Sequence, residues 1–257
     1  MGECVARGLA GNECLSGIPG LVGGSAIQNI GAYGQEAHET LRSVQVYDRK
    51  ERSIRELSNA ECGFGYRTSI FNTTEAGRYC ILRVTFALRT DGRPTIRYRD
   101  LEEALAGRTE TASLGEVRET VRAIRQRKGM LLRENDPDCR SAGSFFKNPL
   151  ITSESFAQLT TIAQAQGIAT VPHYPQPDGT VKIPAAWLIE RAGFAKGYRR
   201  GSVGLSTKHV LAIVNQGEAT AQEVIEFAKE IQAGVYSTFQ IALHPEPVLV
   251  GFLPDIL

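Results

Sequence analysis

Three short stretches of the chain carry side chains that could donate a proton or stabilise a developing negative charge. In FGYRTS, Arg67 follows an aromatic residue and could clamp a carboxylate or stabilise an enolate. In AGSFFKNP, small residues place Ser144 in a tight turn before two phenylalanines, where its hydroxyl could donate a proton. In HPEP, prolines on both sides fix the backbone around Glu246. Taken alone, each pattern is more typical of a non-catalytic role: a solvated arginine, a serine turn and an exposed acid, respectively.

A fourth stretch is rich in glycine. The first 34 residues hold nine of the 26 glycines, interleaved with apolar residues such as Ile18, Leu21 and Ile27. This pattern predicts an ordered loop system whose backbone turns sharply and approaches something closely. Its N–H groups could face a planar or anionic cofactor, although a tightly packed structural turn explains the glycines as well.

Two strands and several helices are expected to position these stretches. Alternating or β-branched residues predict the strands, and apolar periodicity or capping patterns predict the helices. The expected strands are 43–47 and 80–88, and the expected helices are 115–128, 153–166, one opened by Pro184, and one from Thr220 that closes at Gly234. The tail FQIALHPEPVLVGF is expected to be strand-like, interrupted by its prolines.

The first of these helices has two distinct faces. Val117, Val121 and Ile124 form an apolar face, while basic residues that include Arg125 and Lys128 recur on another at three- and four-residue steps. The polar loop at 133–140 then suggests a boundary between lobes. Together these elements predict an α+β or α/β protein in two lobes.

The composition limits the classes of partner. The chain has 257 residues and a formal net charge of +1, so nothing attracts it as a whole to nucleic acid or to an anionic membrane. The start of the chain lacks the long apolar stretch of a secretory signal, and no run is long enough to span a bilayer. We therefore expect a cytoplasmic protein that binds neither nucleic acid nor membrane.

The cysteines and histidines do not suggest a metal or disulfide site. The five cysteines are an odd number and contain no C-x-x-C pair, and the four histidines are scattered along the chain. We therefore expect free thiols, a reducing compartment and no bound metal.

Taken together and in this order, the stretches resemble the UDP-N-acetylenolpyruvoylglucosamine reductase family, also called UDP-N-acetylmuramate dehydrogenases. The resemblance spans essentially the whole chain. The residues that carry it are SGIPGLVGGSAIQNIGAYGQE (16–36), ECGFGYRTSIF (61–71), RSAGSFFKNP (140–149), VKIPAAWLIERAGF (181–194) and LHPEPVLVG (243–251).

The resemblance implies a fold and its division into domains. It implies an α+β chain made of the remainder of a two-lobed FAD-binding domain, of the vanillyl-alcohol-oxidase or PCMH-like type, and a C-terminal α+β substrate-binding domain. The implied boundaries are 1–129 for the second lobe of the FAD-binding domain, 130–238 for the substrate-binding domain and 239–257 for a tail that returns to the flavin site.

The resemblance also implies a reaction in peptidoglycan precursor synthesis. NADPH reduces bound FAD, and hydride then passes to the enolpyruvyl group of UDP-N-acetylglucosamine enolpyruvate, giving UDP-N-acetylmuramate. Hydride addition creates an enolate-like charge that the site must neutralise and protonate. Ser144 matches the family's proton donor, and Arg67 and Glu246 match the residues that flank the enolate. We expect a monomer, which the sequence itself does not test.

Further positions match the family's binding residues. The implied substrate-binding residues are Tyr66, Lys128 and Asn148. The implied flavin-binding residues are Gly23, Gly24, Gln28, Asn29, Ile30, Gly31, Tyr33 and Arg125.

Two departures from the family pattern affect the expected cofactor affinity. Family members carry an N-terminal lobe that grips the flavin pyrophosphate, and this sequence has no counterpart of it. Val248 stands where many members have an arginine near the flavin. We therefore expect weak FAD binding by this chain alone. A flavin-free UDP-sugar-binding remnant and another flavoprotein oxidoreductase of the same architecture are the alternatives to the reductase.

Overall fold

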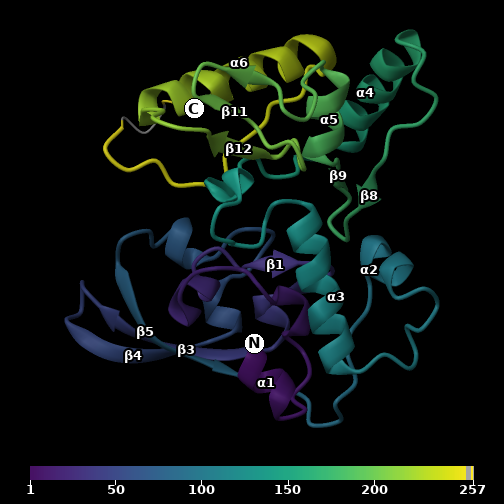
Figure 1. Ribbon diagram of the computed structural model, residues 1–257. Coiled ribbons are helices and arrows are strands. Elements are labelled where there is room, and N and C mark those ends of the chain that lie inside the picture. The colour runs from purple at the N-terminus through teal and green to yellow at the C-terminus, as the bar shows by residue number, and fades with distance from the viewer. Residues whose placement is uncertain (253–255, 257) are drawn as a thin grey trace. The chain divides into compact units, whose positions relative to one another are not determined.

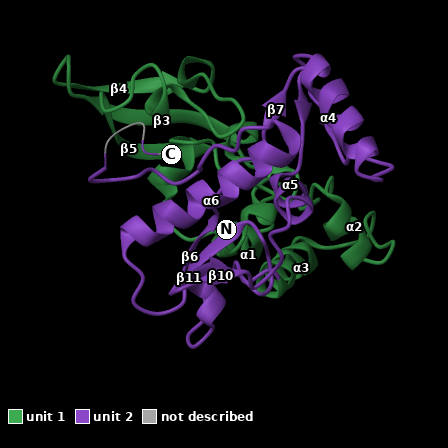
Figure 2. Ribbon diagram, turned by 90° about the horizontal axis from the view of Figure 1, so that it is seen from above, with its two compact units in different colours: residues 1–127 green, residues 128–257 purple. Residues whose placement is uncertain are grey.

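The computed structural model describes residues 1–252 and 256, and the chain forms two compact units, residues 1–127 and 128–257 (Figures 1 and 2). Each unit contains helices, strands and buried apolar clusters of its own. All the strand pairings found in the described residues are antiparallel. The expected mixture of α and β structure is therefore confirmed. No helix in these residues is long and apolar enough to cross a membrane.

Unit 1 is built around a three-stranded antiparallel sheet in the order β4-β3-β5. The strands are β3 (Leu41–Asp48), β4 (Ser53–Ser58) and β5 (Tyr79–Phe86). The predicted strands at 43–47 and 80–88 are confirmed by β3 and β5. Strand β4 has no apolar alternation that would predict it, because only Leu57 of that strand is buried and its other side chains face solvent.

The helices of unit 1 are α1 (Gly2–Ala6), α2 (Arg99–Ala104) and α3 (Leu114–Arg127). The predicted apolar face of α3 is confirmed, since Val117, Val121 and Ile124 are buried. These side chains form one cluster with Leu101 and Leu105 at and after α2. The helix therefore anchors its basic residues to a rigid core.

The glycine-rich start of unit 1 is ordered as a chain of short elements. They are the 3-10 helices η1 (Glu13–Leu15), η2 (Val22–Ala26) and η3 (Ala37–Glu39), with the strands β1 (Gly31–Ala32) and β2 (Gln35–Glu36) between η2 and η3. Tyr33 and Gly34 join β1 to β2 with φ of 49° and 81°. Two consecutive left-handed residues are typical of a tight hairpin turn. The later 3-10 helices are η4 (Ala60–Cys62), η5 (Ile70–Asn72) and, in unit 2, η6 (Pro137–Cys139).

One buried carboxylate ties the sheet of unit 1 together. Asp48, at the end of β3, is fully buried and accepts hydrogen bonds from Arg78 Nη2 at 2.7 Å and Nε at 3.1 Å. The backbone N–H groups of Lys50 and Glu51 also donate to it. Chiefly because of the bonds from Arg78, the pKa of the Asp48 carboxyl lies well below its ordinary range.

The depressed pKa of Asp48 predicts acid sensitivity. A carboxylate whose pKa is lower in the folded state adds stability that is present above its unfolded pKa of about 3.9 and is lost as the pH falls through the folded value. Asp48→Asn should lower the melting temperature at neutral pH and flatten its decline between about pH 5 and pH 2. Melting curves across this range test it, with Asp91→Asn as a control because Asp91 is exposed. An unchanged slope in Asp48→Asn would contradict the assignment.

Unit 2 contains two small antiparallel sheets. The first has the order β10-β11-β12-β6 and the second β7-β9-β8. Their strands are β6 (Ser141–Ser144), β10 (Arg199–Arg200), β11 (Val203–Leu205), β12 (Ala212–Asn215), β7 (Leu150–Ile151), β8 (Tyr174–Pro175) and β9 (Val181–Lys182). Figure 1 shows helix α6 (Ala221–Phe239) lying along β11 and β12. Its buried face joins the apolar core of unit 2.

Three sequence predictions in unit 2 are confirmed and two are wrong. Helix α4 (Ser153–Ala165) and the capping box of Thr220 and Glu223 are present as predicted, and helix α5 (Ala185–Arg191) begins after Pro184. However, α6 does not close at Gly234; it continues to Phe239. The tail from 240 to 252 forms no strand, and its pairing is limited to one isolated bridge between Phe146 and Pro245. Prolines withhold the N–H groups that a strand needs.

Gly234 has a packing role instead of a terminating one. A Cβ atom on this residue would lie 2.5 Å from Cε2 and 2.7 Å from Cζ of Phe194. The Phe194 ring is buried and packs edge-on against Tyr198, with ring centroids 5.2 Å apart. Glycine is therefore needed inside the helix so that this ring can approach the backbone.

Gly234→Ala is expected to destabilise unit 2. Overpacking a core costs roughly 1–3 kcal/mol, which exceeds the about 1 kcal/mol that alanine gains over glycine in a helix interior. Urea unfolding followed by the fluorescence of Trp187, the single tryptophan, measures the change. Gly217→Ala is the control, because a Cβ there would meet nothing within 4 Å and the transition should not move. A midpoint equal to that of the control would show that Phe194 adjusts freely.

Candidate functional site

In unit 1 a tight turn presents Arg67. Gly65 and Thr68 exchange both backbone hydrogen bonds, at 3.0 and 3.2 Å, which leaves Tyr66 and Arg67 at the tip. Arg67 has a φ of 57°, a left-handed conformation that is uncommon for a residue with a side chain. Its Nη2 donates to the carbonyl oxygen of Gly31 at 2.7 Å, and its guanidinium lies 5.1 Å from the centre of the Tyr66 ring. The charge of Arg67 is thus held in one place.

Gly31, in strand β1, makes room for that guanidinium. A Cβ on Gly31 would lie 2.8 Å from Arg67 Nη1 and 2.9 Å from Glu36 Cγ, and 3.2 Å from the carbonyl oxygen of Gln35. Real Cβ atoms are rarely this close to other atoms. The glycine therefore allows Arg67 to lie directly against the hairpin.

Asn29 lies beneath the same turn. It is fully buried, and its φ of 47° is left-handed. Its Nδ2 donates to the carbonyl oxygen of Gly65 at 3.0 Å and to Glu36 Oε2 at 2.7 Å. The neighbouring Ile30 is held through its backbone, whose carbonyl accepts from Ala37 N at 2.8 Å. The loop that also contains Gln28 is therefore fixed from both sides.

The glycines of η2 lie beside exposed apolar side chains. A Cβ on Gly24 would meet nothing within 4 Å, and one on Gly23 would meet only Ile81 at 3.5 Å. Leu21 and Val22 are 87% and 65% exposed. The backbone at this point is open to close approach by another group.

Tyr33 and Arg125 form a buried pair within the α2–α3 cluster. Tyr33, at the tip of the β1–β2 hairpin, packs edge-on against Tyr98, and burial raises the pKa of its hydroxyl to about 12. Burial lowers the pKa of the Arg125 guanidinium, and the nearby Tyr33 hydroxyl opposes that shift. The pair therefore places a positive charge in apolar surroundings at the end of α3.

In unit 2 the tail brings Glu246 beside the segment that contains Ser144. Lys147 N donates to the carbonyl of His244 at 2.9 Å, and Glu246 N donates to the carbonyl of Phe145 at 2.8 Å. Ser144 is the last residue of β6, opposite Ala212 in β12. The backbone of Glu246 thus pairs with the residue next to Ser144, although Glu246 and Ser144 lie a hundred residues apart in the sequence.

Asn148 and Lys128 are held by separate parts of unit 2. Asn148 Oδ1 accepts from Ala185 N at 2.9 Å, which fixes the amide at the start of α5. Lys128 immediately precedes Gly129, whose backbone lies against Asp138 and Lys208. Lys208 Nζ bonds Asp136 at 2.6 Å, and this bond raises the pKa of Lys208. Lys208, which is held by Asp136, therefore lies beside Gly129, the residue after Lys128.

Two residues that no sequence pattern indicated as site residues, Glu36 and His38, form hydrogen bonds with Asn29. His38 N donates to Asn29 Oδ1 at 3.0 Å, and His38 Nδ1 lies 3.3 Å from Glu36 Oε2. Glu36 is the last residue of β2, and His38 follows two residues later in η3. The sequence does not indicate their role, because neither residue belongs to a recognisable motif of fixed spacing.

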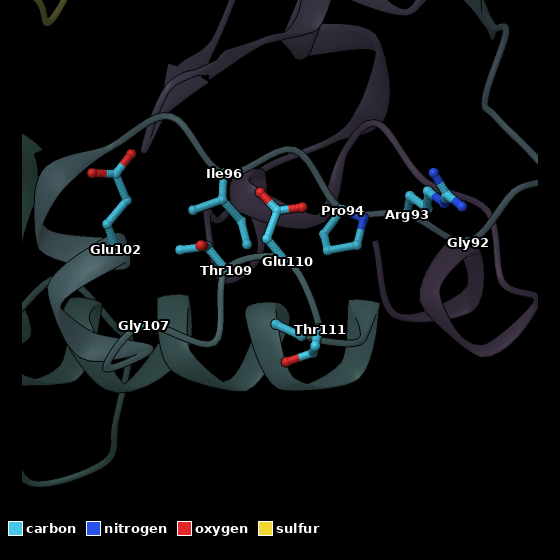
Figure 3. Close-up of a pocket in the computed structure, with 10 residues that line it drawn as sticks. Gly92, Arg93, Pro94, Ile96, Glu102, Gly107, Thr109, Glu110 and Thr111 are labelled. Atoms are coloured by element: carbon cyan, nitrogen blue, oxygen red, sulfur yellow. The ribbon is translucent and has the colours of Figure 1, made fainter.

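A pocket in unit 1 is lined by residues that are not among the predicted site residues (Figure 3). Its volume is about 920 Å³, and its lining comes from the loop after β5, from α2 and from the loop before α3. Glu110, Thr109 and Ile96 lie together in Figure 3. The predicted catalytic and binding positions contribute nothing to its walls, so it does not enter the proposed chemistry.

Potential metal-ligating side chains do not cluster in the described part of the chain, and the cysteines are unpaired. Within residues 1–252 and 256, no cluster of three or more His, Cys, Asp or Glu side chains could hold a metal ion. All five cysteines carry free thiols.

Comparison with known proteins identifies the family. A profile of the UDP-N-acetylenolpyruvoylglucosamine reductase C-terminal domain matches residues 135–250. The chain is 50% identical over 254 residues to the UDP-N-acetylenolpyruvoylglucosamine reductase of Thermobifida fusca, a match that covers 97% of this chain and 70% of the relative. It is 46% identical over 256 residues to that of Mycobacterium tuberculosis H37Ra, covering 97% of this chain and 69% of the relative.

A solved structure gives the same result. The crystal structure of the reductase from Thermus caldophilus matches with a TM-score of 0.59 and 26% identity, covering 95% of this chain and 66% of that one. The chain thus spans about two thirds of the length of the relatives it matches. With half of its residues identical to one of them across nearly its entire length, it belongs to the UDP-N-acetylenolpyruvoylglucosamine reductase family.

Proposed function

We propose that this chain catalyses the reduction of UDP-N-acetylglucosamine enolpyruvate to UDP-N-acetylmuramate in peptidoglycan precursor synthesis, with FAD and NADPH as cofactors. The observation that carries the proposal is the backbone hydrogen bond from Glu246 to Phe145, the residue that follows Ser144 in the sequence. The chemistry of enolate formation and protonation requires three kinds of group, which Arg67, Ser144 and Glu246 provide.

Several features of unit 1 fit a flavin. The backbone at Gly24 is open, and Leu21 and Val22 expose apolar surface beside it, which suits a flat aromatic ring. The guanidinium of Arg125 is buried, so an anionic group of a ligand would compensate the cost of keeping its charge there. We propose that residues 1–129 form this cofactor-binding part, that Gly23, Gln28, Ile30, Gly31 and Tyr33 contribute to it, and that 130–238 holds the substrate.

FAD, when bound and reduced by NADPH, supplies the hydride for the substrate double bond. Arg67 then stabilises the negative charge that develops on the carboxylate side of the substrate, because its guanidinium is already oriented by Gly31. Ser144 delivers the proton to the adjacent carbon, and Glu246 orients the path by which that proton is replaced. Donors aimed at such a charge are typically worth about 2.7–4 kcal/mol each.

An assay on the purified chain with added FAD tests the proposal. NADPH should be consumed when UDP-N-acetylglucosamine enolpyruvate is added, and UDP-N-acetylmuramate should form. UDP-N-acetylglucosamine, which lacks the double bond, is the control and should leave NADPH unchanged. If the enolpyruvyl substrate caused no more NADPH consumption than the control, the proposed reaction would be wrong.

Lys128, Asn148 and Tyr66 are proposed to hold the substrate, and Lys128 gives the clearest test. Lys128→Ala should weaken binding of the UDP-sugar, since an ammonium that pairs with phosphate or carboxylate contributes roughly 1.5–3 kcal/mol. Isothermal titration with the UDP-sugar measures the dissociation constant. Lys229→Ala, which removes an exposed lysine from α6, is the matched control. A dissociation constant unchanged from this control would remove Lys128 from the site.

A further inference from the structure

The side chain of Asn29 is enclosed by protein and joins three separate segments of unit 1. Its relative exposure is 0%, so other parts of the chain surround it completely. Nδ2 donates to the turn residue Gly65 at 3.0 Å and to Glu36 of β2 at 2.7 Å. Oδ1 accepts from the backbone of His38 at 3.0 Å. The two amide hydrogens and the amide oxygen are therefore all engaged.

The turn joined by Asn29 is the one that carries Arg67. Gly65 opens the turn, and its carbonyl is where Asn29 bonds. Beyond the turn, Ser69 Oγ donates to the carbonyl of Ile27 at 2.5 Å, so both ends of the turn are tied to the 27–29 segment. Arg67 then reaches back to Gly31 on the same hairpin. The position of the Arg67 guanidinium thus depends on the hydrogen bonds that hold the turn against the 27–29 segment.

We infer that Asn29 is a positioning residue for Arg67: its buried amide seats the Gly65–Thr68 turn on the β1–β2 hairpin and so fixes where the guanidinium lies. The kinetic consequence of this inference rests on the proposed reductase function, whereas its structural consequence does not. A mutation far from the reacting atoms can lower the rate by as much as roughly a hundredfold if it slightly displaces an oriented catalytic group.

The left-handed backbone of Asn29 decides which variants can test this. Alanine at a φ of 47° would add backbone strain to the loss of the amide. Asn29→Gly removes the amide and accepts this φ. Asn29→Asp also tolerates it and keeps the acceptor for His38, but it cannot donate to Gly65 and places a second carboxylate beside Glu36.

Asn59 provides a matched control in the same unit. Its Nδ2 donates to the carbonyl oxygens of His38 at 2.8 Å and Leu41 at 2.7 Å. Asn59→Ala therefore also removes two amide hydrogen bonds around η3, yet it does not touch the turn that carries Arg67. A purely structural loss should appear equally in both asparagine variants.

The first measurement follows Arg67 itself by ¹⁵N NMR of its guanidinium in the full chain. Asn29→Gly and Asn29→Asp should speed hydrogen exchange and rotation of the Arg67 guanidinium at least about tenfold. The turn would no longer be fixed, so the hydrogen bond from Arg67 to Gly31 would break more often. Asn59→Ala should leave them unchanged. Unchanged Arg67 signals in both Asn29 variants would overturn the inference, whatever the enzyme's activity.

The second measurement is kinetic and uses a double-mutant cycle. Asn29→Gly should slow the substrate-reducing step at least about tenfold. In an Arg67→Ala background, the same change should have no further effect, because residues that act through one another are not additive. A full additional loss in that background would overturn the inference. Absence of reductase activity in the unaltered chain would instead refute the proposed function, and the NMR result would still decide the role of Asn29.

Discussion

Replacing Ser144 with alanine is expected to slow reduction of the enolpyruvyl substrate by at least roughly a hundredfold, the usual contribution of a positioned general acid. The hydroxyl is proposed to deliver a proton to carbon, which is needed only after hydride transfer. NADPH oxidation by enzyme-bound FAD should keep its normal rate. Rapid-mixing spectroscopy of the flavin absorbance separates the two halves.

The structure supplies a matched control on the same strand. Ser141 is also in β6 and, like Ser144, partly buried, but it lies at the far end of the strand opposite Val214. Ser141→Ala should therefore leave both half-reactions unchanged. Ser144→Cys should retain part of the activity, because a thiol can also give a proton. Equal slowing of both half-reactions by Ser144→Ala would show that the residue is structural, given that the substitution hardly alters packing around Phe145.

Arg67→Ala should lower the rate of the same half-reaction by about 10²–10³, the loss typical of removing one donor aimed at a developing charge. The guanidinium bonds Gly31 and leans over the Tyr66 ring, so it is oriented before substrate arrives. Arg67→Lys should recover only a small part of the rate, because an ammonium keeps the charge but not the planar fork. The measurement is again the single-turnover rate of substrate reduction.

Arg97→Ala serves as the control for Arg67. Arg97 is an arginine of the same unit that forms an exposed ion pair with Glu39, at 3.1 Å. Such surface pairs contribute little, so both half-reactions should proceed normally. If Arg67→Lys retained the full rate, charge alone would suffice and the oriented guanidinium would be irrelevant to the reaction.

The sequence by itself determined the elements that local patterns control. The apolar face of α3, the strands β3 and β5 and the capping box of α6 follow from periodicity or from side chains three residues apart, and the structure contains each of them. Family membership was also readable, because the order of several distinctive stretches identifies it without knowledge of any contact.

Local patterns misled where long-range packing overrode them. Gly234 looked like a helix end, since glycine commonly follows the last turn of a helix. In the folded chain it instead accommodates Phe194, which lies forty residues earlier. The prediction of a strand in the tail is also wrong. Pro245 and Pro247 leave few N–H groups for pairing, and in residues 240–252 a single bridge to Phe146 forms.

Only the tertiary structure decided how the candidate residues are held. The sequence selected Asn29 and Arg67 separately, but nothing in their spacing shows that one lies beneath the turn of the other. Likewise the backbone of Glu246 pairs with Phe145, the residue after Ser144, and nothing in the spacing of these residues indicates that contact. Hydrogen bonds and close packing act over a few ångströms, so they depend on which distant segments folding brings together, whereas periodicity reports only on neighbours along the chain.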